Sequence, residues 1–186
     1  MITTLRPTLV VFLGVQLSGK STLAKIISQS IGLPYVSIDM VRQWLFGELS
    51  SPKDWKDEES RLRHNANIKK AYDHFFHVIN NNLSSGQSLI VEMPHLGSRQ
   101  ADLVAMVERF NFDLKIIWCY ISDDSDEEIQ KRVAVRSLDK DMAQIRSEDY
   151  NMFKVKIQKP TLTNTLDVDT CQPLEDSIRQ ILDWIM

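Results

Sequence analysis

The sequence predicts an α/β domain in which five short strands alternate with helices and form a mostly parallel sheet with helices on both faces. Three observations support this. Apolar segments of strand length recur along the chain, segments with helical spacing separate them, and a glycine-containing turn joins the first strand to the first helix. We expect a single domain over residues 1–186, because this length suits one domain with a substantial core.

The five expected strands are short runs rich in apolar residues. The first, Thr8–Gly14, reads TLVVFLG and lacks polar alternation, which is typical of a strand buried on both faces. The others are Tyr35–Asp39, Ser88–Met93, Leu114–Ile121 and Thr165–Asp169. Parallel strands of this kind place their carboxyl ends at one edge of the sheet, where ligands bind in such folds.

Apolar residues at helical spacing mark the segments between the strands. Residues 20–31 have an apolar stripe, and Gly32 follows as a stop signal. Ser125 and the acidic residues after it favour a helix start over 125–138. Further helices are expected at about 40–47, 58–83, 98–110, 147–158 and 173–185. The charged connector at about 137–147 is expected to form a small mobile lid.

The composition is ordinary for a soluble globular protein, with 43% hydrophobic and 25% charged residues. The net charge of −3 shows no overall bias toward nucleic acid. The sequence has neither the roughly 18 uninterrupted apolar residues of a membrane span nor the pattern of a signal peptide. We therefore expect a cytoplasmic protein whose two cysteines, Cys119 and Cys171, are reduced and buried.

Residues 14–21, GVQLSGKS, fit the phosphate-binding spacing G-x-x-x-x-G-K-[ST]. The expected strand before them and helix after them are the context that this motif needs. We expect Lys20 to reach the outer phosphates of the nucleotide and the Ser21 hydroxyl to ligate Mg²⁺. ATP is favoured over GTP because no Asn-Lys-x-Asp motif follows a late strand. The candidate nucleotide-binding residues of this segment are Gly14, Val15, Gln16, Leu17, Ser18, Gly19, Lys20, Ser21 and Thr22.

Asp39 and Arg42 follow the second expected strand, next to the phosphate loop. A carboxylate there can accept the proton of an attacking hydroxyl, and Arg42 lies one helical turn further on the same face. Arg42 could hold a polar or anionic part of an acceptor. The alternative for Asp39 is a helix N-cap, and the two roles are compatible.

These segments also carry a family resemblance. The strings GVQLSGKS, SIDMVRQWL, SLIVEMPH, KRVAVR and NTLDVDTCQPLEDSIRQIL occur in the order typical of small P-loop kinases. The chain resembles the group that contains polynucleotide 5′-hydroxyl kinase domains, zeta toxins, chloramphenicol phosphotransferase and gluconate kinase. The resemblance implies a P-loop NTPase fold and ATP-dependent transfer of phosphate to a hydroxyl. It further implies that Asp39 is the base and that Arg42 grips the acceptor.

The resemblance also implies that Arg132 and Arg136 act on the nucleotide from the lid helix, with Lys20, Asp39 and Arg136 as the catalytic residues. Guanidinium groups there would offset charge on the transferring phosphoryl group. The alternative is a solvated helix face in which Glu128 pairs with Arg132. Glu92, which ends the third expected strand, would hold a Mg²⁺-bound water or an acceptor hydroxyl.

The leading functional hypothesis is therefore a Mg²⁺-dependent kinase that moves the γ-phosphate of ATP to a hydroxyl group. A nucleotide-binding regulator and an ATP hydrolase without a dedicated acceptor are the alternatives. The overall acidity favours a small-molecule acceptor. A nucleic-acid end remains open, because Arg61, Arg63, Lys69 and Lys70 could form a basic track or a solvated helix face. The sequence does not indicate an oligomeric state.

Overall fold

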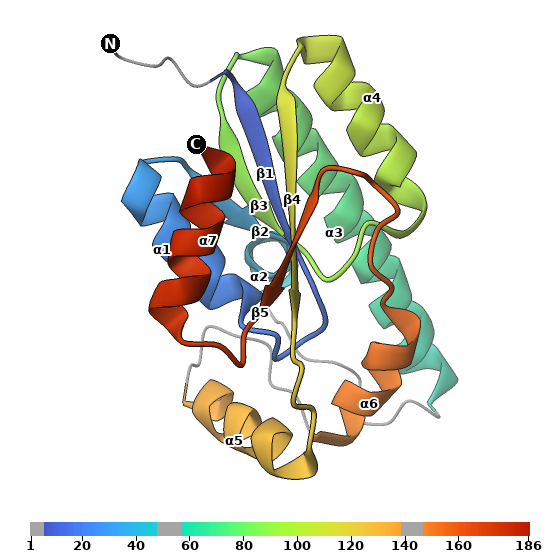
Figure 1. Ribbon diagram of the computed structural model, residues 1–186. Coiled ribbons are helices and arrows are strands. Elements are labelled where there is room, and N and C mark those ends of the chain that lie inside the picture. The colour runs from blue at the N-terminus through green and yellow to red at the C-terminus, as the bar shows by residue number, and fades with distance from the viewer. Residues whose placement is uncertain (1–5, 48–56, 139–146) are drawn as a thin grey trace.

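Five parallel strands form the centre of the molecule (Figure 1). The computed structural model describes residues 6–47, 57–138 and 147–186. The strands are β1 (Thr8–Leu13), β2 (Tyr35–Ser37), β3 (Leu89–Glu92), β4 (Asp113–Tyr120) and β5 (Thr165–Asp169). Their order across the sheet is β2-β3-β1-β4-β5, and every neighbouring pair is parallel. The predicted five-stranded parallel sheet is confirmed.

Helices cover both faces of this sheet (Figure 1). They are α1 (Lys20–Ile31), α2 (Ile38–Phe46), α3 (Glu58–Ser84), α4 (Gln100–Phe110), α5 (Asp126–Ser137), α6 (Ser147–Lys156) and α7 (Leu174–Ile185), with a short 3-10 turn, η1, at Gly97–Arg99 before α4. Helices α1 and α7 pack on one face, and α2, α3 and α4 pack on the other. Helices α5 and α6 lie beyond the carboxyl ends of the strands.

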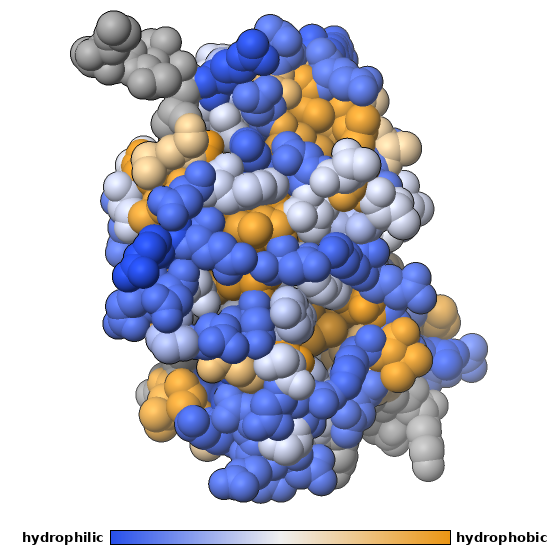
Figure 2. Space-filling model, viewed as in Figure 1, coloured by the Kyte–Doolittle hydropathy of each residue, from blue (hydrophilic) through white to orange (hydrophobic). Residues whose placement is uncertain are grey.

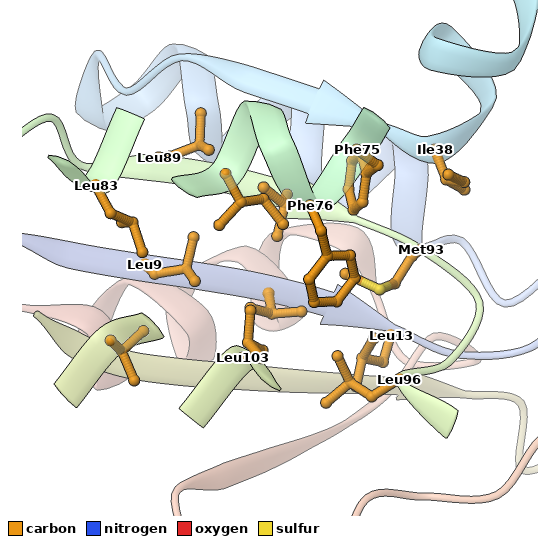
Figure 3. Close-up of a cluster of buried hydrophobic side chains, with 14 of the residues drawn as sticks. Leu9, Leu13, Ile38, Phe75, Phe76, Leu83, Leu89, Met93, Leu96 and Leu103 are labelled. Atoms are coloured by element: carbon orange, nitrogen blue, oxygen red, sulfur yellow. The ribbon is translucent and has the colours of Figure 1, made fainter. Parts of the chain in front are cut away.

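The two faces of the sheet bury separate hydrophobic clusters, because alternate residues of β1 point in opposite directions. Leu9, Val11 and Leu13 contribute to the larger cluster, beneath α3 and α4 (Figure 3). Val10 and Phe12 contribute to the cluster beneath α1 and α7. All six residues of β1 are buried, as predicted for a strand covered on both faces.

A third, smaller cluster ties α5 and α6 to the carboxyl edge of the sheet. Val15 and Leu17 of the β1–α1 loop pack there with Ile129 of α5 and Tyr150 of α6. The loop that follows β1 is therefore supported from the side opposite the sheet. Residues 139–146 of the expected lid lie outside the described residues.

Two local expectations were wrong. The second strand ends at Ser37, not at Asp39, because the Ser37 hydroxyl accepts a hydrogen bond from the Met40 N–H and caps α2. Asp39 is therefore a residue of the first helical turn and not the N-cap. Cys171 is exposed, in contrast to the buried Cys119, because it lies in the loop between β5 and α7.

Hydrophilic residues cover most of the face that carries α5, α6 and α7, and hydrophobic residues there form scattered patches (Figure 2). Among the described residues, no helix combines the length and the apolar character that crossing a bilayer demands.

Candidate active site

The β1–α1 turn, residues 14–19, forms the phosphate loop. Gly14 has a φ of 146°, and a Cβ atom there would lie 2.2 Å from the carbonyl oxygen of Cys119 on β4. Gly19, directly before α1, has a φ of 71°. Glycine is thus needed at the first position because no side chain fits, and at the second because the backbone is left-handed.

Leu17 also has a left-handed backbone, with a φ of 70°. This conformation is unfavourable for a residue with a Cβ atom. Two contacts offset its cost. The side chain is buried in the third cluster, and the carbonyl oxygen accepts a hydrogen bond of 3.1 Å from Nη1 of Arg132. The shape of the phosphate loop therefore depends on α5 as well as on the loop's own glycines.

Arg132 joins α5 to two loops of the molecule. Its Nε donates to Glu128 at 2.6 Å, Nη1 donates to Leu17 O and Thr170 Oγ1, and Nη2 donates to Thr170 O. Nη2 also lies 3.8 Å from Sγ of Cys171. Protein groups thus engage all five N–H groups of the guanidinium. The Glu128–Arg132 pair considered as an alternative is present, within a larger network that holds the phosphate loop.

A cavity of about 320 Å³, which we call the loop cavity, opens between the phosphate loop, α1 and α5. The N–H groups of the first turn of α1 have no helical partners, and the helix dipole adds positive charge there, so an anion is favoured. The residues that line it are Leu17, Gly19, Lys20, Ser21, Thr22, Glu128, Lys131, Arg132, Val135 and Arg136.

A second cavity of about 340 Å³, which we call the α3–α6 cavity, lies beside the first. Its walls come from the phosphate loop, α2, α3, the β3–η1 loop, α5 and α6. The residues that line it are Gln16, Lys20, Ile38, Asp39, Arg42, His64, Asn65, Ile68, Tyr72, Glu92, Pro94, His95, Arg136, Asp149, Met152, Phe153, Lys156 and Ile157. Lys20 and Arg136 line both cavities, so these two side chains mark the place where the cavities meet.

A buried ion pair lies at this junction. Nζ of Lys20 is 3.4 Å from Oε1 of Glu92, and the two side chains are 6% and 7% exposed. The other oxygen of Glu92, Oε2, accepts a hydrogen bond of 2.9 Å from the Tyr35 hydroxyl. Burial raises the pKa of Tyr35, and the nearby Glu92 carboxylate raises it further. Each carboxylate oxygen of Glu92 therefore has a partner, which fixes its orientation.

Asp39 and Arg42 form the ion pair that the sequence places on one helix face. Nη1 of Arg42 donates to Oδ1 of Asp39 at 3.0 Å, and both residues line the α3–α6 cavity. Tyr72 stands near this group. Its pKa is raised by burial first, and then by the charges of Asp39 and Glu92. The predicted proton acceptor and the predicted acceptor-binding arginine thus share one cavity with Glu92.

The remaining predicted residues divide between the cavities and the interior. Ser21 and Thr22 line the loop cavity, whereas Gln16 lines the α3–α6 cavity. Three residues of the candidate nucleotide set line neither cavity, because they form the buried side of the phosphate loop: Gly14, Val15 and Ser18.

The family of AAA domains designated AAA_33 matches residues 9–160, which run from β1 to beyond the end of α6. The chain belongs to this family. No curated protein matches the sequence.

Solved structures of small kinases resemble this AAA_33 chain over almost its whole length. A protein provisionally named a kinase, from Chloroflexus aurantiacus J-10-fl, is 25% identical with a TM-score of 0.71, and the match covers 98% of this chain and 95% of that one. A gluconokinase from Sinorhizobium meliloti 1021 is 19% identical with a TM-score of 0.61, covering 97% and 92%. An APS kinase from Mycobacterium tuberculosis, in complex with AMPPNP and APS, is 16% identical with a TM-score of 0.61, covering 97% and 98%.

Together with the five-stranded parallel sheet, these matches show that this AAA_33 chain has the P-loop NTPase fold, as the sequence predicts. The resemblance to small P-loop kinases is confirmed at that level, and the more specific subgroup suggested by the sequence strings stays a prediction.

Sequence reasoning missed most of the α3–α6 cavity. Four of the missed residues are Ile68 and Tyr72 of α3 and Met152 and Phe153 of α6. Ile68 and Tyr72 stand out in the sequence only as members of an apolar helical stripe, which resembles any core-facing stripe. His95 of the β3–η1 loop also lines the cavity, and burial lowers its pKa.

The oxygen donors at the junction fit the Mg²⁺ expected from the sequence. Mg²⁺ prefers oxygen ligands and retains several waters, so few protein ligands are needed. Ser21 lines the loop cavity, and Glu92 lines the α3–α6 cavity, 3.4 Å from the Nζ of Lys20, which lines both. Ser21 would hold the ion directly, and Glu92 would hold one of its waters or a hydroxyl of the acceptor.

Proposed function

We propose that this protein is an ATP- and Mg²⁺-dependent kinase that transfers the γ-phosphate of ATP to a hydroxyl group of a small molecule. One observation carries the proposal: two cavities meet at Lys20 and Arg136, and each has the groups that one substrate needs. The loop cavity has the helix N-terminus and Ser21, and the α3–α6 cavity has Asp39 and Arg42. The kinase structures with the same fold support this interpretation.

The reaction places the acceptor in the α3–α6 cavity and ATP in the loop cavity. Asp39 accepts the proton of the acceptor hydroxyl as its oxygen attacks the γ-phosphorus. The new bond joins that oxygen to phosphorus, and the bond to the bridging oxygen breaks and releases ADP. Arg42, which lies 3.0 Å from Asp39, orients that carboxylate and the acceptor.

Positive charge at the junction stabilises the transferring group. Lys20, the first residue of α1, and Arg136, in the last turn of α5, both line the two cavities where they meet. Fixed cations aimed at developing charge are among the largest contributions to phosphoryl transfer. When Mg²⁺ is bound at Ser21, it neutralises charge on the outer phosphates.

The test follows transfer of the γ-phosphate from ATP with Mg²⁺ to two pools of acceptors, small hydroxylated metabolites and 5′-hydroxyl oligonucleotides, beside an acceptor-free control. We expect label in the small-molecule pool. Asp39→Asn should lower turnover by about three orders of magnitude and leave ATP affinity within about twofold, because the base acts on the acceptor proton alone.

Asp102→Asn is the matched control, since Asp102 is an exposed residue of α4 that lines neither cavity. Equal phosphate release with and without acceptors would favour a hydrolase. Tight ATP binding without any turnover would favour a nucleotide-binding regulator. Label in the oligonucleotide pool alone would support a kinase whose acceptor is a nucleic-acid end and not a small molecule.

A further inference from the structure

The α3–α6 cavity has two helical walls that are distant in the sequence. On α6 and just after it, the lining residues follow the i, i+3, i+4, i+7, i+8 spacing of one helix face: Asp149, Met152, Phe153, Lys156 and Ile157. Ile68 and Tyr72 of α3 lie one helical turn apart on the other wall. Figure 1 shows α6 beside the N-terminal half of α3. Both helices are therefore in a position to contact the acceptor.

Apolar and aromatic side chains contribute much of this lining. Tyr72 and Phe153 supply aromatic rings, and Ile68 and Met152 supply aliphatic surface. The ring of His95 lies 6.5 Å from that of Tyr72, at an angle of 39°. Such walls favour a ligand with an apolar or aromatic framework, because that framework buries its own apolar surface against them.

Gln16 places an unused polar atom in the same lining. Its Oε1 is buried and has no hydrogen-bond partner among the described residues. A buried amide oxygen favours a ligand that brings an N–H or O–H donor, because buried polar groups are almost always paired. The phosphate loop thus contributes a contact to the acceptor side.

The cations of the cavity differ in what already neutralises them. Lys20 pairs with Glu92, and Arg42 pairs with Asp39. Lys156, in the last turn of α6, is exposed and has no ion-pair partner in the part of the chain that the structure describes. Its ammonium group is therefore available for an anionic group of the acceptor.

From these features we propose that the acceptor is a small alcohol with an aromatic or other apolar ring framework and one anionic group, a carboxylate or a phosphate ester. The ring lies between α3 and α6, the anion contacts Lys156, and a donor group of the acceptor pairs with Gln16. This inference rests on the proposed function, because it names the substrate class of the same transfer site.

The first experiment measures binding by calorimetry in the presence of Mg²⁺ and AMPPNP, which keeps the loop cavity filled. Four probes separate the features. Para-hydroxymethylbenzoate and adenosine monophosphate have both a ring and an anion, benzyl alcohol has only the ring, and gluconate has only the anion. We expect at least one of the first two probes to bind about tenfold more tightly than benzyl alcohol and gluconate.

Variants of α6 then assign each feature to a side chain. Lys156→Gln should weaken the better ring-and-anion probe about tenfold and leave benzyl alcohol unchanged. Lys154→Gln is its control, because Lys154 pairs with Asp124 and does not line the cavity. Phe153→Ala should weaken the binding of the better ring-and-anion probe and of benzyl alcohol. Val155→Ala should weaken neither, because Val155 is 80% exposed and lies outside the lining.

Tighter binding of gluconate, an equal effect of Lys156→Gln on charged and neutral probes, or no measurable binding of either ring-and-anion probe would overturn the substrate class. Label transfer separates this result from the proposed function. Asp39-dependent transfer to gluconate would support the proposed kinase function and overturn the proposed class of acceptor. Binding of a ring-and-anion probe through Lys156 without transfer to any acceptor would support the proposed class of ligand and overturn the proposed kinase function.

Discussion

The loop cavity and the α3–α6 cavity meet at Lys20 and Arg136, but the chain builds them in different ways. Two short segments supply every residue of the loop cavity, one at 17–22 and the other at 128–136. The α3–α6 cavity draws on six separate parts of the chain, from Gln16 to Ile157. One cavity is thus a local motif closed by a single helix, and the other is a product of the tertiary fold.

This difference follows from what each cavity binds. Backbone N–H groups recognise phosphate, so a fixed spacing of glycines and one lysine is enough to form the site. An acceptor is recognised by side chains that converge from several elements, and these side chains can change without altering the sheet. We therefore expect substitutions in the phosphate loop to affect folding, and substitutions in the acceptor walls to affect recognition.

The largest effect should come from Gly14→Ala. The added Cβ would lie 2.2 Å from the Cys119 carbonyl oxygen and 2.7 Å from Oγ of Ser18, so the phosphate loop and β4 must move apart. We expect the free energy of unfolding to fall by about 3 kcal/mol or more, and ATP binding to be lost with it. Urea unfolding followed by circular dichroism measures the change.

Gly86→Ala is the control, because Gly86 also has a positive φ, of 72°, but no atom lies within 4 Å of the added Cβ. It should cost about 1 kcal/mol through backbone strain alone. If both variants lost equal stability, the close approach of β4 would not be the reason that Gly14 is required.

The difference between a local motif and a cavity built by the tertiary fold also explains which features could be predicted from the sequence. Residues 20–31 were expected as a helix and form α1 with those bounds, because the apolar spacing and Gly32 act locally. The end of β2 was misplaced by two residues, because Ser37 and Ile38 suit either a strand or a capped helix start. Only the tertiary fold decided between them.

Side-chain partners were harder to predict than elements. The sequence indicates Asp39, Arg42 and Glu92 as polar residues near strand ends, and the structure brings all three to one cavity. It gives no sign that Tyr35 holds Glu92, because residues 57 positions apart meet only through the pairing of β2 with β3. The acceptor walls on α6 lacked any local signal for the same reason.

An intermediate effect is expected from Arg132→Ala. This arginine donates to Glu128, to Leu17 O and to Thr170. Its removal leaves the phosphate loop, in which Leu17 has a left-handed backbone, without this hydrogen bond from α5. We expect a loss of about 2 kcal/mol of stability, measured by urea unfolding, and weaker ATP binding. Arg179→Ala is the control, since Arg179 of α7 makes a 3.6 Å ion pair with Asp176, is 72% exposed and lines neither cavity. Unchanged stability with reduced turnover would instead assign Arg132 a direct contact with phosphate.

The smallest effect is expected from Glu92→Gln, at the junction of the two cavities. Glu92 holds Lys20 at 3.4 Å in a buried pair, so it competes with the triphosphate for the same ammonium group. In buffer with EDTA, Glu92→Gln should raise ATP affinity about tenfold, or about 1.4 kcal/mol, because the neutral amide no longer attracts Lys20 or repels the nucleotide. Without ATP, the variant should melt at a lower temperature, because a buried lysine has lost its counter-charge.

The control for this last substitution is Glu127→Gln, an exposed residue of α5 that lines neither cavity. Because ATP supplies the missing negative charge, it should raise the melting temperature of Glu92→Gln more than that of Glu127→Gln. If metal-free ATP affinity were unchanged or weaker in Glu92→Gln, the carboxylate would not compete for Lys20. The two cavities would then share the side chains of Lys20 and Arg136, but ATP would not replace Glu92 as the partner of Lys20.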